Sequence, residues 1–144
     1  MISPTFQAMT LAAKHIKLVQ QSWRALRDVN AQLIGDLFYS RLFFEHPEAR
    51  ALFPKDMTAQ HQKLIDMINV VVARLEHLET LTDEIEALGR RHDGYGTLPH
   101  HYGWVGESLL WTLERGLGDD WTPAVQEAWT ICYTTLADAM LRQP

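Results

Sequence analysis

Apolar residues recur at intervals of three and four along nearly the whole chain. Side chains at this spacing share one face of an α-helix, whereas a half-buried β-strand would alternate apolar and polar positions. No segment shows a convincing alternation of that kind. The pattern therefore predicts an all-α protein built from six to eight helices.

The first half of the chain contains two apolar stripes followed by a helix-breaking pair. One stripe covers residues 16–26 and the next covers residues 33–43. The second helix should end at His46, because Pro47 follows it and the residue before a proline resists the helical conformation. A short turn, PEARALF, then leads to Phe53.

A long helix is expected next, with Thr58 as its N-cap. Its apolar face consists of Leu64, Ile68, Val71, Leu75 and Leu78. Thr80 or Thr82 can cap the following helix, which should end at His92.

Two further helices complete the predicted set. Pro99 fits the first turn of one helix, which should end in the glycine-containing segment 116–118. Thr122 and Pro123 fit the N-cap and first residue of the last helix, which should continue to about Leu141. Unequal helix lengths and the break after the second helix do not suit an up-and-down four-helix bundle.

The length of 144 residues fits a single domain, spanning 1–144 with 1–10 as a loose N-terminal extension. The net charge of −5 offers no basic face, so nucleic acid and anionic membranes are poor partners. Cys132 is the single cysteine, which excludes an internal disulfide and a metal site built only of cysteines. It fits a reducing compartment, and we expect a cytoplasmic location. We find no signal-peptide pattern and no apolar run of about 18 residues that could span a membrane.

The segment LGRRHDGYG places His92 in the last turn of a predicted helix. A histidine at this position often acts as a helix-terminal cation, because cations there interact favourably with the loose carbonyls and the helix dipole. The same imidazole could instead hold a metal. The local sequence leaves both interpretations open.

Six segments occur in one order along the chain: LFYSRLF, HPEARALF, QHQKL, LGRRH, HYGWVGESLLWTLE and TPAVQEAW. In these segments and their order the chain resembles the bacterial single-domain haemoglobins, the globin part of flavohaemoglobins and neuroglobin. The resemblance covers nearly the whole sequence, from LVQQSWRAL to YTTLADAM. It implies a globin fold, six to eight helices around a haem pocket, with haem b (iron protoporphyrin IX) as the cofactor.

On the proximal side, the resemblance implies that His92 of LGRRH is the iron ligand. A neutral imidazole needs an acceptor for its other ring nitrogen, and Leu88, one turn earlier, could supply its carbonyl and pack under the porphyrin. Other residues are implied as haem contacts: Phe53, Leu64, Leu98, Tyr102 and Val105.

On the distal side, the resemblance implies that Tyr39 of LFY donates a hydrogen bond to the bound gas. The second polar distal residue is either Gln60 or His61. Gln60 lies one turn before Leu64 on the expected core face, whereas His61 is rotated by about 100° toward a pocket rim or the surface. When residues are counted back from His92 without gaps, the distal position of the family also falls on Gln60. Glutamine is a poorer iron ligand than histidine, so Gln60 predicts a five-coordinate haem. His61 in the pocket would instead allow the six-coordinate resting state of neuroglobin.

The remaining histidines lie near polar neighbours or helix ends, and we expect them on the solvated surface. These are His15, His46, His77, His100 and His101. His100 and His101 begin a helix and could approach a haem propionate.

The expected function is reversible binding of dioxygen and other diatomic gases, including nitric oxide and carbon monoxide, for oxygen storage or delivery. The alternative is nitric oxide dioxygenation with a separate reductase, because these 144 residues show no flavin or NAD domain. Flavohaemoglobins carry a hydrogen-bonded proximal set: the histidine, a tyrosine in the following helix and a glutamate near the end of the last helix. This set is incomplete here. Tyr102 matches its tyrosine, but the glutamate position falls at or beyond Pro144 and Asp138 is out of register. A third alternative is a haem-free interaction module. We assign no catalytic residue.

Overall fold

A computed structural model of the chain describes residues 11–26, 28–94 and 96–141, so the expected extension at 1–10 lies outside the described residues. Within these ranges all regular structure is helical, as the apolar spacing predicted. The elements are α2 (Ala13–Leu26), α3 (Ala31–Glu45), the 3-10 helix η1 (Pro47–Leu52), α4 (Thr58–Ala73), η2 (Leu75–Leu81), α5 (Thr82–Gly94), α6 (Pro99–Leu117), η3 (Gly118–Asp120) and α7 (Pro123–Leu141). In this part of the chain no helix has the length and apolar character needed to cross a membrane.

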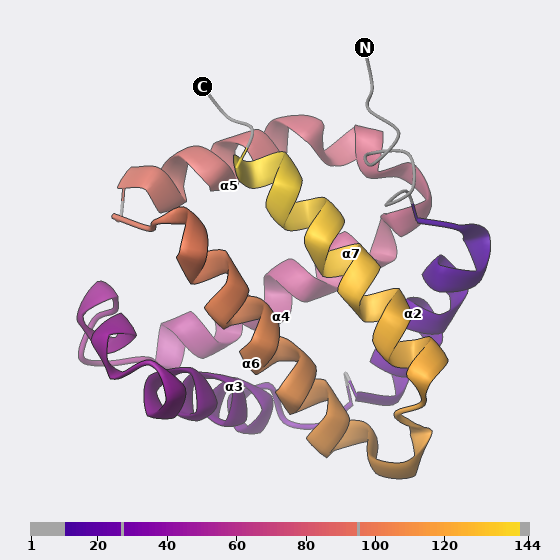
Figure 1. Cartoon of the computed structure of the whole chain (residues 1–144), viewed down its shortest axis with the longest axis horizontal. Helices are drawn as coiled ribbons and strands as arrows, with labels where there is room; N and C mark the ends of the chain where they lie inside the picture. The colour runs from indigo at the N-terminus through magenta and orange to yellow at the C-terminus, as the bar shows by residue number, and fades with distance from the viewer. Residues whose placement is uncertain (1–10, 27, 95, 142–144) are drawn as a thin grey trace.

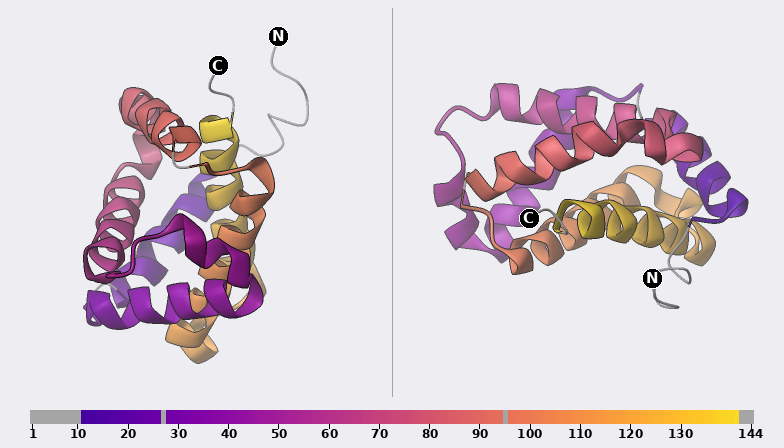
Figure 2. Two further views of the ribbon diagram at one scale, coloured as in Figure 1. Left: turned by 90° about the vertical axis from the view of Figure 1, so that its left-hand side faces the viewer. Right: turned by 90° about the horizontal axis from the view of Figure 1, so that it is seen from above.

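The helices pack in crossing pairs rather than as a parallel bundle. Helix α7 contacts α2, α5 and α6, and α3 lies against both α4 and α6. Figure 1 shows α6 and α7 running diagonally across the face toward the viewer, with α4 behind them and α5 along the top. The turned views in Figure 2 show the same separation of α4 and α5 from α6 and α7.

Two tryptophans join three helices at the centre of the main core. The rings of Trp23 on α2 and Trp129 on α7 meet edge to face with their centroids 6.2 Å apart. The Trp129 indole N–H donates to Ser22 Oγ at 2.8 Å, and the Trp23 indole N–H donates to Asn69 Oδ1 on α4 at 2.7 Å. Burying an indole is favourable only when its N–H finds an acceptor, and both do here.

Two predicted helix boundaries are confirmed. Helix α3 ends at Glu45 with His46 as its C-cap, immediately before Pro47. Helix α7 begins at Pro123, and Thr122 Oγ1 accepts the Val125 N–H at 3.2 Å. Proline at the first helical position has no N–H to leave unpaired, which explains the sharp start.

The predicted long helix from Thr58 to Leu78 was wrong in two respects. Helix α4 ends at Ala73, and the two last leucines of the expected stripe fall in η2. Thr58 is the first helical residue rather than the N-cap, and its N–H donates to Asp56 Oδ1 at 3.0 Å. A helical stripe of leucines continues across the break, so periodicity alone did not reveal it.

The predicted apolar face of α4 was also rotated by one residue over part of its length. Ile65, Val71 and Val72 are fully buried, while Leu64 and Ile68 are only partly buried. The hydroxyls of Thr80 and Thr82 donate to backbone carbonyls three residues earlier, and Thr82 is the first residue of α5 rather than the residue before it.

Gly35 allows α3 and α4 to cross at close range. A Cβ atom on this residue would lie 2.6 Å from the His61 Cβ and 3.0 Å from the His61 Cα. Because the second of these is a backbone atom, a side-chain rotation could not relieve the contact. The crossing therefore requires a glycine at this position.

We predict that Gly35→Ala destabilises the protein relative to Gly103→Ala. Both glycines lie inside helices, but a Cβ on Gly103 would meet nothing within 4 Å. Each alanine gains helix propensity, and only Gly35→Ala adds a clash, which should cost about 1–3 kcal/mol. Urea unfolding of both variants measures the difference, and equal midpoints would contradict this account of the crossing.

Candidate functional site

His92 occupies the last turn of α5, and its Nδ1 lies 2.7 Å from the Leu88 carbonyl oxygen. A carbonyl oxygen only accepts, so Nδ1 donates and carries the ring proton. In the neutral imidazole the lone pair then resides on Nε2, which is the form that binds a metal. This contact is the one expected from the sequence.

Tyr102 lies beside His92 on the proximal side. The two ring centroids are 6.2 Å apart, and Tyr102 is buried on α6. Leu88 packs with Tyr102 and the α7 residue Met140 in one apolar cluster. The cluster joins α5, α6 and α7 around the candidate ligand.

Tyr133 anchors Tyr102, a role that no local sequence pattern indicated. Its hydroxyl donates to the Tyr102 carbonyl oxygen at 2.7 Å, from α7 to α6. Burial, followed by the proximity of Tyr102, raises the pKa of Tyr133, so the hydroxyl keeps its proton at neutral pH. A Cβ on Gly106 would lie 2.8 Å from the Tyr133 ring, so this glycine leaves room for the contact.

Tyr39 is the centre of a second, aromatic cluster on the distal side. It is 5% exposed, and its ring meets Phe38 and Phe53 edge to face at centroid distances of 4.8 and 5.4 Å. Leu64 and Val105 pack in the same cluster. The fold thus brings together the tyrosine and three of the apolar residues that the resemblance implied as haem contacts.

The Tyr39 hydroxyl is paired with Gln60. The Gln60 side-chain nitrogen donates to Tyr39 Oη at 3.2 Å, which leaves the hydroxyl proton itself to be donated elsewhere. Burial raises the pKa of Tyr39, and the hydrogen bond from Gln60 opposes that shift without cancelling it. At neutral pH the hydroxyl is therefore a protonated donor in an apolar surrounding.

His61 lies in the α3–α4 crossing rather than at a solvated rim, which corrects the expectation for this residue. Its Nδ1 is 3.0 Å from Gln32 Oε1, and its ring stacks on Tyr39 with centroids 5.5 Å apart and planes 11° from parallel. The backbone at Gly35 presses against it. The residues that touch it, Gln32, Gly35 and Tyr39, all belong to α3.

Three of the remaining histidines are less exposed than their polar neighbours suggested. His15 is 8% exposed, His46 stacks on Trp104 at a centroid distance of 4.2 Å, and His101 Nδ1 accepts the Leu98 N–H at 2.9 Å. Only His77 and His100 are exposed, as predicted. Leu98 itself is 50% exposed and belongs to neither the proximal nor the distal apolar cluster of described residues.

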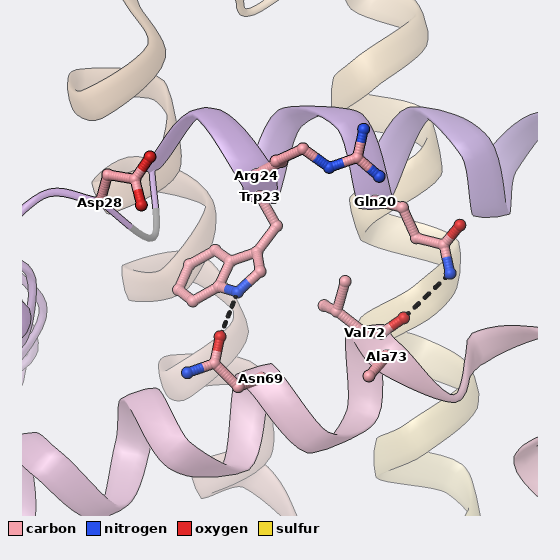
Figure 3. Close-up of a pocket in the computed structure, with 7 residues that line it drawn as sticks. All are labelled: Gln20, Trp23, Arg24, Asp28, Asn69, Val72 and Ala73. Carbon is pink, nitrogen blue, oxygen red and sulfur yellow. Dashed lines mark hydrogen bonds between the residues drawn. The ribbon is translucent and has the colours of Figure 1, made fainter.

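A separate hollow of about 540 Å³ lies between α2 and α4. Figure 3 shows its lining residues, Gln20, Trp23, Arg24, Asp28, Asn69, Val72 and Ala73. Two hydrogen bonds cross it: Trp23 donates to Asn69, and the Gln20 amide donates to the Val72 carbonyl oxygen at 3.1 Å. These bonds tie α2 to α4, and none of the predicted site residues lines the hollow.

Comparison with known proteins agrees with this arrangement. The Globin family model matches residues 36–140. Neuroglobin of Tetraodon nigroviridis is 31% identical over 146 aligned residues, 92% of this chain and 91% of that protein. The flavohemoprotein of Vibrio cholerae is 31% identical over 91% of this chain, which spans only 34% of that longer protein.

Two solved structures have the same fold. One is an engineered carbene transferase, made from a protein of Rhodothermus marinus provisionally assigned as a nitric oxide dioxygenase. It superimposes with a TM-score of 0.80 at 27% sequence identity, and the match covers 90% of this chain and 89% of that one. A bacterial globin of Campylobacter jejuni gives a TM-score of 0.76 at 21% identity, covering 88% and 91% of the two chains. At that identity the likeness shows the fold alone.

The helices, the buried tyrosine and the carbonyl-fixed histidine define a haem-binding fold. The chain belongs to the globin family. Its residues suit the haem of that family, because His92 Nδ1 is oriented by the Leu88 carbonyl oxygen, and Phe53, Leu64, Leu88 and Val105 are apolar side chains that are only partly buried. The predicted globin fold is confirmed.

We predict that His92→Ala strongly weakens haem retention. Losing the hydrogen-bond partner of a metal ligand costs about 10–100-fold in metal affinity, so losing the ligand itself should cost at least roughly a hundredfold. The Soret absorbance of the purified protein measures haem content. His77→Ala, at an exposed histidine, is the control. An unchanged ferrous spectrum and haem content in His92→Ala would remove the assignment.

Proposed function

We propose that the chain binds haem b through His92 and reversibly binds dioxygen, nitric oxide or carbon monoxide in a pocket beside Tyr39 and Gln60. When bound, the haem supplies an iron with an open coordination position for a diatomic gas. The side chains around that position decide how long each gas stays. The observation that carries the proposal is the Gln60-to-Tyr39 hydrogen bond, which leaves a buried hydroxyl proton to be donated.

Tyr39 is suited to hold a polar gas. Gln60 fixes the direction of the hydroxyl, and the rings of Phe38 and Phe53 restrict its rotation and exclude water. A donor held in such a low-dielectric surrounding stabilises a ligand of partial negative charge by about 1 kcal/mol or more. Dioxygen develops more of that charge than carbon monoxide, so the pocket favours retention of dioxygen.

The side chains nearest the hydroxyl leave the sixth coordination position to the gas. Gln60 is a poor iron ligand, and the His61 ring is engaged by Gln32 and stacked against Tyr39. Moving His61 toward a haem would break both contacts. We therefore expect a five-coordinate ferrous haem, and we assign the chain to oxygen storage, buffering or delivery in the cytoplasm.

Nitric oxide dioxygenation is the second candidate function. The structural neighbour assigned provisionally to that reaction and the relatedness to flavohemoproteins favour it. The same pocket would hold dioxygen while nitric oxide is converted to nitrate, and a reductase would return the iron to the ferrous form. Sustained nitrate formation with an added reductase would identify this function. Slow autoxidation without such turnover would identify reversible binding.

We predict that Tyr39→Phe accelerates oxygen dissociation by roughly ten- to a hundredfold. The variant keeps the ring packing and removes a single donor, whose loss should cost about 1–3 kcal/mol. Stopped-flow displacement of oxygen measures the rate. Carbon monoxide dissociation in the same variant is the internal control and should change much less. If the oxygen rate is unaltered, Tyr39 does not face the gas.

We further predict that Gln60→Leu changes oxygen dissociation, whereas His61→Leu leaves the coordination of the ferrous iron as it is. In both the wild type and His61→Leu, the ferrous spectrum should be five-coordinate and gas binding should rise linearly with gas concentration. A low-spin, six-coordinate ferrous spectrum in the wild type that becomes five-coordinate in His61→Leu would reverse the assignment of the distal residue.

A further inference from the structure

The corner between α5 and α6 is held by two consecutive backbone N–H groups. The Thr97 N–H donates to the His92 carbonyl oxygen at 3.0 Å. The Leu98 N–H donates to His101 Nδ1 at 2.9 Å, and the His101 N–H returns to the Leu98 carbonyl oxygen at 3.0 Å. One short segment thus connects the backbone of His92 to the side chain of His101.

This arrangement gives the first turn of α6 a cap supplied from its own third residue. A side chain at this position that accepts the N–H of the residue before the helix forms half of a capping box, a role usually taken by Glu or Gln. His101 can take this role only while Nδ1 has a lone pair. The ring is therefore neutral, with its proton on Nε2.

Two ionisable groups, His100 and Glu48, act on the His101 ring, and two more, His46 and Glu107, lie on the other contacts of Trp104 or His46. The His100 ring lies at a centroid distance of 4.5 Å and lowers the pKa of His101. Glu48 on η1 has the opposite effect on that pKa. The Trp104 ring contacts His101 at a centroid distance of 4.7 Å and also stacks on His46, whose Nε2 is 3.9 Å from a Glu107 carboxylate oxygen. Burial, then the proximity of His100, lowers the pKa of His101, and Glu48 only partly offsets this.

We propose that neutral His101 is a positioning residue for the haem site, and that its protonation releases the α5–α6 corner that carries His92 and Tyr102. The inference rests on the proposed haem role of His92. A protonated Nδ1 becomes a donor and repels the Leu98 N–H. It also places a positive charge at a helix N-terminus, which the helix dipole disfavours.

The lowered pKa sets the direction of the pH dependence. A group whose pKa is lower in the folded state binds its proton more weakly there than in the unfolded chain. Its stabilising contribution is present above the ordinary histidine value of 6.5 and is lost as the pH falls through the lower value. The corner should therefore loosen on the acid side of pH 6.5.

The neighbouring histidines would not produce the same effect. His46 stacks on Trp104 and its Nε2 lies 3.9 Å from Glu107, so neither of these contacts involves the Leu98 N–H. The His100 side chain is exposed, and within the described residues its contacts are with the rings of His101 and Trp104. This difference supplies a matched control one residue away from His101.

The test follows the Leu98 amide resonance by NMR between about pH 5 and about pH 8, in the full chain carrying haem and carbon monoxide. In the wild type and in His100→Gln, the resonance should titrate with a midpoint below pH 6.5. In His101→Gln it should stay constant, because glutamine accepts the N–H and does not titrate. A resonance that titrates in His101→Gln, or that stays constant in the wild type, would overturn the proposal.

A second measurement tests the connection to the site. The rate of haem transfer to an excess of an acceptor protein should rise on acidification in the wild type and in His100→Gln. This increase should be about threefold to tenfold larger than in His101→Gln, which is the range expected for the loss of one hydrogen bond at a helix end. Equal pH dependence in all three proteins would overturn the positioning role. The Soret band separates this result from a failure of the proposed function: a chain that takes up no haem refutes haem binding, while the Leu98 titration of that chain still tests the bond to His101.

Discussion

The close crossing of α3 and α4 determines the distal half of the molecule. Without a side chain on Gly35, the two helices approach until His61 lies against the α3 backbone. The next residue on α3 that faces α4 is one turn further along and is Tyr39, which therefore meets Gln60. A wider crossing would separate the hydroxyl from the amide and leave the buried tyrosine without a fixed direction.

The proximal half depends on a different kind of constraint. The Leu88 carbonyl and the His92 imidazole are four residues apart on one helix, so their contact needs only helical geometry and the second lone pair of a carbonyl oxygen inside α5. The surrounding cluster of α6 and α7 then fixes where that helix end lies. A local hydrogen bond sets the protonation form of the imidazole, and tertiary packing sets its position.

This difference explains which features could be predicted from the sequence. The helical pattern, the breaks at prolines and the histidine–carbonyl pair follow from contacts within one turn. The choice of Gln60 over His61 as the distal residue rested on the helical period and on the family's register, and it stays a prediction, because both side chains contact Tyr39. The end of α4 at Ala73, the anchoring by Tyr133 and the burial of His15 all depend on residues far away in the sequence, and no local pattern revealed them. The cap on Leu98 is an instructive exception. The spacing from Leu98 to His101 is that of a capping box, but the acceptor is a histidine rather than the usual Glu or Gln.

Three histidines in this chain illustrate how the partner of one ring nitrogen decides the use of the other. In His92 and His61, Nδ1 donates to an oxygen, so Nε2 carries the lone pair. Their surroundings then separate them, because the His92 ring lies beside Tyr102 while the His61 ring is stacked against Tyr39 within a helix crossing. In His101, Nδ1 accepts, which makes the contact dependent on the ring remaining neutral. The same kind of side chain thus donates to a carbonyl oxygen in α5, packs between α3 and α4, and accepts a backbone N–H at the start of α6.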